Sequence, residues 1–348
     1  MASRIPVTIL TGFLGAGKTT LIRHLLGNAC GRRIALVINE FGDLGVDGAL
    51  IEGCGESACG AGEIVELTNG CICCTVSDDF VPAMESILAR DVLPDHVVVE
   101  TSGLALPQPL VRAFNWPRLR NRLTIDGIIV VVDGKAVVEG RFASDPVAVD
   151  IQRQADANLD HESPLAELFE DQLVSADIVV VNKSDLLDPD EVDGLIARLR
   201  HESREGTRVV AARNGELPAD VVLGVRAAAE NGADTRQARH HHDDEDHDHD
   251  HDEFESFVVE FGSVAEPETL SARIEETVRK HDILRIKGFA TVSGRPMRLA
   301  VQAVGPRVEH YFDRPFRPDE ERATRLVVIG LAGLDRTGIR TGLTAAAC

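Results

Sequence analysis

The sequence predicts an α/β fold, in which a domain with a largely parallel sheet contains a phosphate-binding loop and precedes a small α+β domain. Three observations predict it. Short apolar runs alternate with longer stretches of helical character over the first two thirds of the chain. The first run leads directly into a glycine-rich loop and then into a helix. A tract without any apolar residue, from His240 to Asp252, then separates a second group of elements.

The first domain is expected to contain several buried strands, because β-branched apolar runs recur between helical stretches. The expected strands are Ile5–Leu10, Ile34–Ile38, His96–Val99, Gly127–Val132 and Asp177–Val181. The helix that begins at Lys18 is expected to be closed by Gly27.

The second domain is expected to combine strands with one helix. The expected strands are Phe254–Phe261, Leu284–Val292, Met297–Val304 and Thr324–Ile329, with a helix at Pro267–Lys280. The predicted boundaries are residues 1–235 for the first domain and 254–348 for the second. Residues 236–253 are predicted to be a disordered His/Asp-rich linker, because a segment without apolar side chains cannot bury surface.

Composition excludes several classes of protein. The chain has 348 residues, and 36 Lys and Arg against 57 Asp and Glu give a net charge of −21. This charge argues against nucleic acid or an anionic membrane as the main partner. With no long apolar run and no signal peptide, the expected location is the cytoplasm. Seven cysteines in a cytoplasmic chain indicate metal binding rather than disulfides.

The glycine-rich loop between the first strand and helix is a complete phosphate-binding motif. Its backbone N–H groups are expected to converge on phosphate oxygens at the positive end of the helix. Lys18 is expected to reach the β- and γ-phosphates, and the Thr19 hydroxyl to bind Mg²⁺. The residues expected to bind the nucleotide here are Gly12, Gly15, Ala16, Gly17, Lys18, Thr19 and Thr20.

Four residues after the fifth apolar run indicate which base is bound. In Asn182-Lys183-Ser184-Asp185, the Asp185 carboxylate can accept two hydrogen bonds from the N1 and 2-amino groups of guanine, a pair that adenine lacks. Asn182 and the stem of Lys183 can support the base. Following a phosphate loop in an open α/β sheet, this motif favours GTP over ATP and so disfavours a kinase.

A second acid is expected near the phosphates. Glu100 ends the third apolar run and is predicted to hold a Mg²⁺-bound water, while Gly103 is predicted to approach the γ-phosphate. Asp133 is a weaker candidate of the same kind. Lys18, Glu100 and Gly103 form the expected catalytic set.

Three cysteines in four positions predict a soft-metal site. Cys71, Cys73 and Cys74 follow Asn69-Gly70, and their thiolates suit Zn²⁺, Co²⁺ or Cu⁺. On an extended segment Cys74 faces away from the other two, so a shared site needs a bend. Glu40 lies where loops that sense the γ-phosphate usually fall, so it is expected to link the metal to the nucleotide. Two or three sulfurs leave a tetrahedral ion in need of one or two further ligands, and Cys54 and Cys59 are candidates for these.

The linker itself carries six of the twelve histidines. Such a tract binds divalent metal ions loosely, as an antenna or buffer. A solvated run of charges without a specific role is the equal alternative.

Together these motifs resemble the CobW family of metal-handling GTPases, relatives of the nickel-inserting HypB and UreG proteins. The resemblance covers nearly the whole chain. The matching segments are Thr11–Thr20, Asn39–Gly42, Asn69–Cys74, Glu100–Ala105 and Asn182–Asp185, together with a small domain after a His-rich linker. It implies a P-loop GTPase domain and GTP hydrolysis coupled to metal transfer.

Three further segments resemble the branch of the family associated with cobalamin biosynthesis. They are Gly42–Gly48, Phe114–Pro117 and Asp160–Leu165. This resemblance implies that the chain supplies Co²⁺ to the aerobic cobaltochelatase. Thiolates hold Zn²⁺ at least as tightly as Co²⁺, so the choice of cobalt rests on the resemblance alone.

The resulting hypothesis is a nucleotide-switched metal site. GTP and Mg²⁺ order the loop of Glu40, which aligns Cys71, Cys73 and Cys74 around the metal ion until hydrolysis releases it to a receiving enzyme. A GTPase that supplies zinc remains an alternative, as does a non-enzymatic metal buffer or sensor. A nucleotide-dependent dimer is left open.

Overall fold

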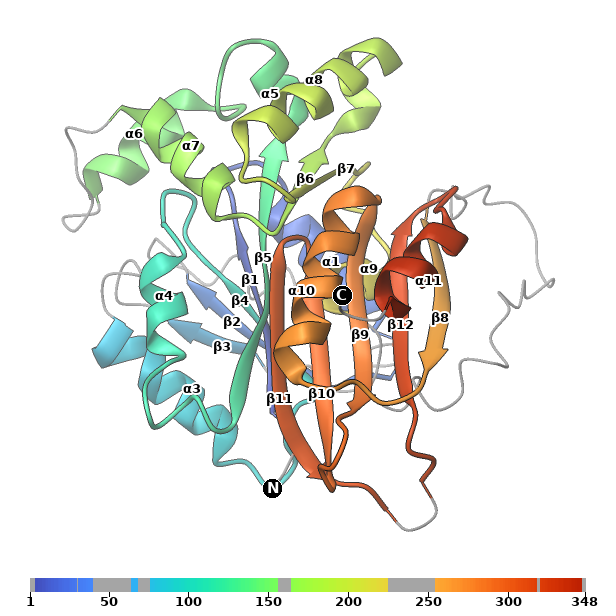
Figure 1. Ribbon diagram of the computed structural model, residues 1–348. Helices are drawn as coiled ribbons and strands as arrows, with labels where there is room; N and C mark the ends of the chain where they lie inside the picture. Colours follow the sequence, from blue (N-terminus) through green and yellow to red (C-terminus); the bar gives the residue numbers. More distant parts are fainter. Residues whose placement is uncertain are drawn as a thin grey trace, which may run out of the picture. The chain divides into compact units, whose positions relative to one another are not determined.

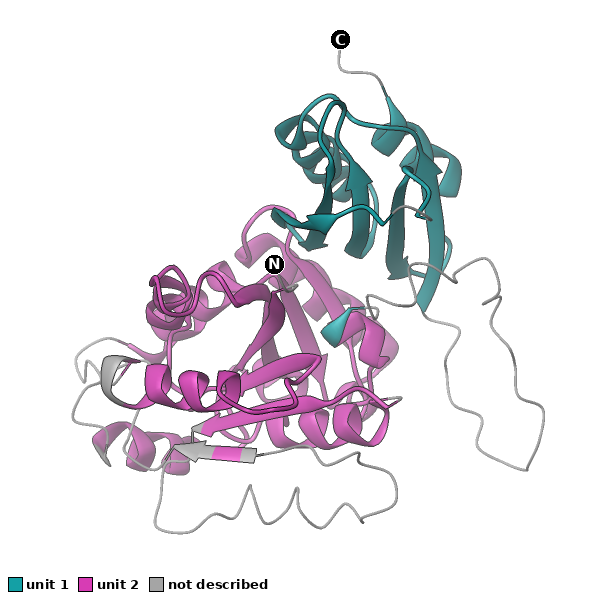
Figure 2. Cartoon of the chain, turned by 90° about the horizontal axis from the view of Figure 1, so that it is seen from below, with its two compact units in different colours: residues 1–3, 223–348 teal, residues 4–222 magenta. Residues whose placement is uncertain are grey.

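The computed structural model describes residues 4–29, 31–39, 64–67, 76–155, 164–224, 254–317 and 320–345. The chain divides into two compact units, coloured separately in Figure 2. In chain order, the first unit is Arg4–Val222, drawn in magenta as unit 2, and the second is Leu223–Cys348 with Met1–Ser3, drawn in teal as unit 1. The segment predicted as a linker, 236–253, lies outside the described residues.

The first unit is built on a seven-stranded sheet in the order β3-β2-β4-β1-β5-β6-β7, and every neighbouring pair is parallel (Figure 1). The strands are β1 Ile5–Thr11, β2 Ile34–Asn39, β3 Ile64–Leu67, β4 His96–Glu100, β5 Leu123–Asp133, β6 Ile178–Asn182 and β7 Arg208–Ala211. The predicted parallel α/β sheet is therefore confirmed. The short strands β3 and β7 were not predicted.

Helices connect these strands. They are α1 Lys18–Gly27, α3 Val81–Leu88, α4 Gln108–Ala113, α5 Gly134–Val138, α6 Pro146–Ala155, α7 Leu165–Ser175, α8 Pro189–Glu202 and α9 Ala219–Leu223, with short helical turns η1 Val76–Phe80 and η2 Ser184–Leu186. Helix α1 includes Gly27 as its last residue and is capped by Asn28, so the prediction that Gly27 closes it was one residue early.

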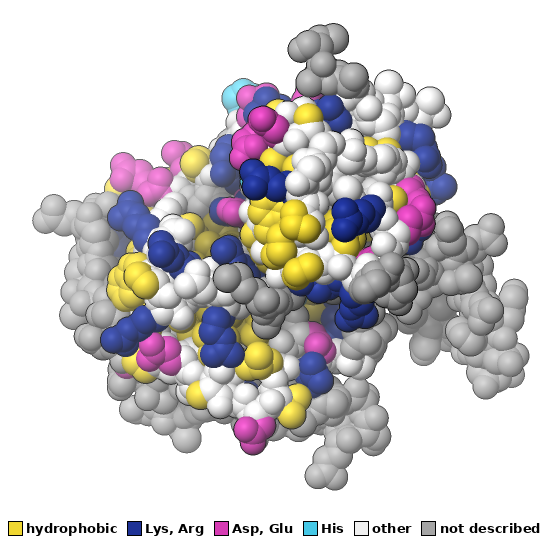
Figure 3. Space-filling view, turned by 60° about the horizontal axis from the view of Figure 1, so that its bottom comes forward, with side chains coloured by type: hydrophobic (Ala, Val, Ile, Leu, Met, Phe, Trp, Pro, Cys, Tyr) yellow, Lys and Arg dark blue, Asp and Glu magenta, His cyan; other side chains and the backbone are white. Residues whose placement is uncertain are grey.

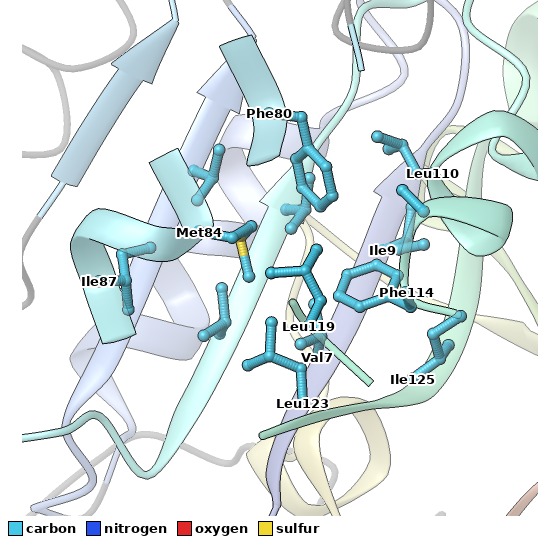
Figure 4. Close-up of a cluster of buried hydrophobic side chains, with 14 of the residues drawn as sticks. Val7, Ile9, Phe80, Met84, Ile87, Leu110, Phe114, Leu119, Leu123 and Ile125 are labelled. Carbon is cyan, nitrogen blue, oxygen red and sulfur yellow. The ribbon is translucent and has the colours of Figure 1, made fainter. Parts of the chain in front are cut away.

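The central strands are buried on both faces. Every residue of β4, β5 and β6 is buried, which explains the unbroken apolar runs Val97–Val99, Ile128–Val132 and Ile178–Val181 within them. On one face, Phe80 and Met84 pack with Leu110 and Phe114 onto side chains of β1 and β5 (Figure 4). Burial of this apolar surface holds the sheet rigid beneath its carboxyl edge.

The second unit is an antiparallel sheet of five strands in the order β11-β10-β9-β12-β8, with two helices. The elements are β8 Phe254–Phe261, α10 Pro267–Lys280, β9 Ile283–Thr291, β10 Met297–Val304, β11 Arg307–Pro315, β12 Thr324–Leu331 and α11 Arg336–Thr344. Helices α10 and α11 contribute Leu270, Ile274, Ile339 and Leu343 to a core shared with the sheet. The predicted α+β architecture is confirmed, and strand β11 was missed.

The longest described helices, α8 and α10, have 14 residues each. Within the described part of the chain, no helix has both the length and the apolar character needed to cross a membrane.

Candidate functional site

The residues predicted to bind the nucleotide meet at the carboxyl edge of the parallel sheet. Leu10 at the end of β1 pairs with Glu100 at the end of β4, and Asp133 of β5 pairs with Asn182 of β6. Side chains that follow such strand ends converge on a crevice outside the sheet. The topology therefore gathers residues that lie up to 170 positions apart in the chain, from Gly12 to Asn182 (182 − 12 = 170).

The phosphate loop requires glycine at two positions for steric reasons. Gly12 has φ +135°, and a Cβ atom there would lie 2.1 Å from the carbonyl oxygen of Val131. Gly17 has φ +102°, and its Cβ would lie 2.1 Å from Nδ2 of Asn182. The loop backbone is thus pressed against β5 and against the residue that opens the base-recognition motif.

Lys18 closes over the loop that precedes it. Its Nζ donates to the carbonyl oxygens of Gly12, at 2.8 Å, and Phe13, at 3.4 Å. The side chain is buried at 7% exposure, whereas Thr19 is half-buried and Thr20 exposed. The ammonium group therefore lies at the loop itself, where anionic phosphate oxygens would replace neutral carbonyls as its partners.

Asn182 joins the phosphate loop to a second loop. Its Nδ2 donates to the carbonyl oxygen of Ala16 at 2.9 Å, and its Oδ1 accepts from the backbone N–H of Gly215 at 2.8 Å. Gly215, at φ +71°, packs so closely on α1 that a Cβ would lie 2.7 Å from the nitrogen of Leu21.

Sequence reasoning missed this second loop, which follows β7. The available signal was the dipeptide Asn214-Gly215, which is typical of left-handed turns and does adopt them here, with Asn214 at φ 49°.

Lys183 and Asp133 form the buried side of the base-recognition region. Lys183 has a left-handed backbone, at φ 61°, and its Nζ donates to Asp133 Oδ2 at 2.6 Å and to Ser144 Oγ at 2.9 Å. Asp133 also accepts from the Ser144 hydroxyl and caps α5 through the N–H of Ala136. The structure thus places Asp133 beside Lys183, whereas the sequence had suggested a magnesium-associated role like that of Glu100.

The charge of Asp133 is maintained by these contacts. Burial raises the pKa of the carboxyl, but the hydrogen bonds from Lys183, Ser144 and Ala136 outweigh burial and lower its pKa below 3.8. Asp133 is therefore a carboxylate under all ordinary conditions. It fixes the direction of the Lys183 side chain.

Asp185 lies beyond this buried group and is accessible to a ligand. It belongs to the turn η2 and is exposed, whereas Asn182 and Ser184 on either side of Lys183 are buried. The Ser184 hydroxyl and N–H both donate to the carbonyl oxygen of Ala212, which fixes the turn. An exposed carboxylate on a fixed turn suits recognition of the guanine edge.

Glu100 and Gly103 lie on the other side of the phosphate loop. Glu100 is buried at 4% exposure at the end of β4, and the following N–H, of Thr101, donates to Leu10 at 3.0 Å. Gly103 packs on the loop, since a Cβ there would lie 2.7 Å from the nitrogen of Leu14. The carbonyl oxygen of Gly103 accepts from Gln172 Nε2 at 3.1 Å. The segment after β4 is therefore held against the phosphate loop.

The predicted metal ligands other than Thr19 lie outside the described residues. These ligands are Glu40, Cys71, Cys73 and Cys74, and the possible further ligands Cys54 and Cys59 also lie outside. Within the described ranges, no group of three or more His, Cys, Asp or Glu side chains could hold a metal ion.

The strands that lead to these segments are described. Strand β2 ends at Asn39, one residue before Glu40, and Asn39 pairs with Leu67, the last residue of β3. Ile38 of β2 pairs in turn with Glu100. The chain therefore approaches both Glu40 and Cys71 from the edge of the sheet that carries Glu100 and the phosphate loop.

Comparison with known proteins identifies relatives of both units. Residues 6–211 match the family model described as CobW/HypB/UreG, nucleotide-binding domain. Residues 254–347 match the model described as cobalamin synthesis protein cobW C-terminal domain.

Two individual proteins are similar to this chain over nearly its whole length, and a third is similar over about half of it. A Sinorhizobium protein named zinc chaperone CobW is 52% identical over 343 residues, which cover 98% of this chain and 97% of that protein. A Pseudomonas aeruginosa protein of the same name is 53% identical over 348 residues, which cover 99% of this chain and 92% of that protein. A Schizosaccharomyces pombe protein, zinc-regulated GTPase metalloprotein activator 1, is 39% identical over 186 residues, covering 53% of this chain and 40% of its own.

Proposed function

The chain belongs to the CobW/HypB/UreG family and is a GTPase, and from that premise we propose that it is a metallochaperone. In this proposal it binds a divalent metal ion in its GTP-bound state and releases the ion to a receiving protein after hydrolysis. One observation carries the proposal. The paired ends of β2 and β3, Asn39 and Leu67, lie beside the strand end that bears Glu100.

That pairing supports a metal site close to the nucleotide. Glu40 follows Asn39 directly, and Cys71 is only four residues beyond Leu67, a span of at most about 14 Å. On the other side, η1 begins at Val76, two residues after Cys74. Both segments are thus short extensions from fixed anchors at the phosphate edge, which supports a direct coupling of metal and nucleotide.

The described residues fit a magnesium nucleotide. The cradle around Gly12 and Gly17 has no room for a Cβ, so only glycine there lets the loop backbone fold closely enough to enclose phosphate oxygens. The Thr19 hydroxyl and Glu100 carboxylate are hard oxygen donors of the kind that Mg²⁺ prefers, and they would hold it. When bound, Mg²⁺ neutralises charge on the β- and γ-phosphates.

The protein's own residues then have distinct roles. Lys18 would exchange the carbonyl oxygens of Gly12 and Phe13 for phosphate oxygens. Asp185 would accept from guanine, while Asn182 holds the base site to the phosphate loop and Lys183 holds it to Asp133. Loss of the γ-phosphate would remove the contact that orders the loop of Glu40, so that Cys71, Cys73 and Cys74 no longer converge on the ion.

Zinc is the cargo that the comparisons favour, because the relatives identical at 52% and 53% are both named zinc chaperones. Thiolate ligands are also consistent with Zn²⁺. Delivery of Co²⁺ to the aerobic cobaltochelatase, expected from the sequence resemblance, is the second candidate, since the second unit matches a domain described by cobalamin synthesis. A strain lacking the chain decides between them: slow growth at low zinc supports zinc, and loss of cobalamin at normal zinc supports cobalt.

Metal release on hydrolysis tests the proposed function. The protein is loaded with Zn²⁺ and either GTP or a non-hydrolysable analogue, and a chromophoric chelator reports free metal. We expect release at the rate of hydrolysis with GTP and retention with the analogue. Equal release rates with both nucleotides would contradict the proposal.

A metal buffer is the remaining alternative, and deletion of Arg239–Glu253 separates it from a chaperone. A buffer loses its metal capacity with this segment, whereas the proposed chaperone keeps its tight site. Sedimentation with GTP and with GDP shows in addition whether the GTP-bound state is a dimer.

A further inference from the structure

One exposed turn is strongly basic in a chain whose net charge is −21. Arg112 in the last turn of α4, and Arg118, Arg120 and Arg122 between α4 and β5, are all exposed, and residues 112–122 include no acid. Among the described residues the one acidic partner of these arginines is Glu85, which lies 3.4 Å from Arg118. Four exposed positive charges within eleven residues favour an anionic partner. We call these four arginines, together with Trp116, the arginine turn.

The arginine turn is a fixed surface. Leu119 is fully buried in its centre, and Phe114 packs edge-on against Phe80 with ring centroids 5.5 Å apart. The N–H of Leu119 donates to Trp116, and that of Ile5 in β1 donates to Arg122. The arginines therefore extend from a rigid backbone, which lowers the entropic cost of binding a partner. Lys and Arg side chains are spread over the face that Figure 3 shows, with hydrophobic side chains between them.

An exposed tryptophan lies within this basic surface. Trp116 is 40% exposed and is the one tryptophan of the chain. Tryptophan and arginine are the residues most enriched in the energetic centres of protein interfaces. This combination fits a short acidic peptide, whereas a long polyanion would be repelled by the remaining charge of the protein.

The chain itself contains such a peptide. Residues 243–253 carry eight acids and three histidines, and we call them the acidic tract. The chain leaves the first unit through α9, which is tied to the amino edge of the sheet: Asp220 pairs with Arg32, just before β2, and Val222 accepts from Thr8 at 3.4 Å. Arg122 lies at the same edge, directly before β5.

The connection is long enough for the acidic tract to reach the turn. From Gly224 to Asp243 there are 19 residues (243 − 224), which span up to about 65 Å. A compact unit of this size has a radius of gyration of about 17 Å. A tethered ligand within reach has an effective concentration near the millimolar range, so even a weak ionic contact is populated.

We propose that the acidic tract docks on the arginine turn of its own chain through ion pairs with Arg112, Arg118, Arg120 and Arg122. The contact is electrostatic and therefore weakens with salt. Arginines and metal ions then compete for the same carboxylates. This inference does not depend on the proposed metallochaperone function.

Fluorescence of Trp116 tests the proposal in the full-length chain. The variant changes the eight acids of the tract to Asn or Gln and keeps its length and histidines. We expect acrylamide to quench Trp116 at least twofold more strongly in this variant than in the wild type. Wild type in 1 M NaCl, and a variant with the four arginines changed to Gln, should both match the acid-free variant. Arg198→Gln, on exposed α8, is the matched control and should behave as wild type.

Three outcomes overturn the proposal. One is equal quenching in wild type and the acid-free variant. A second is protection of Trp116 that grows with protein concentration, which would mean that the tract of a second copy docks. The third is protection by added heparin with no effect of the tract, which would assign the turn to another polyanion. GTP hydrolysis, retained in each variant, verifies that the proteins are folded.

Discussion

Gly17 and Asn182 show at the scale of single residues how the phosphate loop and the base site depend on one another. Gly17 leaves room for the amide of Asn182, and that amide holds the carbonyl of Ala16 and, through Gly215, the loop after β7. A change at either residue therefore disturbs both halves of the nucleotide site.

Substitution of Gly17 by Ala should weaken GTP binding by more than tenfold. The new Cβ would lie 2.1 Å from Asn182 Nδ2 and must displace it, in addition to straining a left-handed backbone at φ +102°. Titration with a fluorescent GTP analogue measures the effect. Gly140→Ala is the control for strain alone, since Gly140 has φ +77° and nothing within 4 Å of its Cβ. Equal GTP affinities for the two variants would contradict this prediction.

Asp133→Asn should lower GTP affinity about tenfold, because a hydrogen bond between charged groups contributes roughly 1.5–3 kcal/mol and Lys183 would lose one. Asparagine still caps α5, so the change isolates the charge. Calorimetry with GTP gives the affinity. The control is Asp335→Asn. Asp335 caps α11 in the second unit, so this change should leave the GTP affinity unchanged.

The pH dependence of this contact follows from the lowered pKa of Asp133. A carboxyl whose folded pKa is depressed contributes stability that is present above its unfolded value, here 3.8, and is lost as pH falls through the lowered pKa. The Asp133–Lys183 contribution to GTP affinity should therefore be constant from pH 8 down to about pH 4. A decline between pH 7 and pH 5 that disappears in Asp133→Asn would show that this assignment is wrong.

Secondary structure elements differ in how far their sequences predicted them. Strand β10 and helix α10 have their predicted bounds, because their apolar periods are unbroken and Pro267 marks the start of the helix. Strand β5 begins four residues earlier than predicted, since buried polar residues such as Thr124 and Asp126 interrupt its apolar run. A local apolar pattern therefore locates the strand, but it cannot show that polar residues at the start of the strand are buried by tertiary contacts.

Strand β11 was missed for a related reason. Its residues Arg307–Pro315 mix charged and aromatic side chains without a regular apolar alternation, and the strand, at the edge of the sheet, is secured by pairs such as Arg298–Asp313 with the neighbouring strand. Cross-strand pairs of this kind cannot be seen in one segment alone. The same limit explains Asp133, because an acid at a strand end can face either a magnesium ion or a lysine from the next strand.

Glu320 joins strands β10 and β11 by accepting from Arg314 at 2.6 and 2.9 Å and from Arg298 at 3.1 Å. Hydrogen bonding to Arg314 is the main cause that lowers the pKa of Glu320 from 4.5 to about 2. This shift corresponds to stability on the order of 3 kcal/mol, present above pH 4.5 and lost as pH falls toward 2.

Glu320→Gln should therefore lower the unfolding free energy of the second unit at pH 7 by 2–3 kcal/mol, and by much less near pH 2. Tyr311, the one tyrosine, lies in β11 and reports this unit by near-ultraviolet circular dichroism in a Trp116→Phe background. Glu321→Gln is the control, because Glu321 is 70% exposed and pairs with Arg325 at 3.2 Å. Similar losses in both variants would contradict the role of Glu320.

At the scale of the whole molecule, the parallel sheet of the first unit is the element through which the proposed function would couple nucleotide to metal. Its carboxyl edge carries the phosphate loop, Glu100 and the base-recognition turn, and β2 and β3 end at the same edge before Glu40 and Cys71. The motifs could all be found in the sequence. Their proximity in space depends on the order of the strands in the sheet, and the motifs alone do not predict that order.

The proposed function requires that GTP and metal binding are coupled at this edge. The most direct test is calorimetric titration with Zn²⁺ in three states of the protein: with a Mg²⁺–GTP analogue, with Mg²⁺–GDP and without nucleotide. We predict that Zn²⁺ binds at least tenfold more tightly with the analogue, and that this tight site is lost when Cys71, Cys73 and Cys74 are each changed to Ser. When Zn²⁺ is bound first, the affinity for the analogue should rise by the same factor. Equal Zn²⁺ affinity in all three nucleotide states would contradict the account.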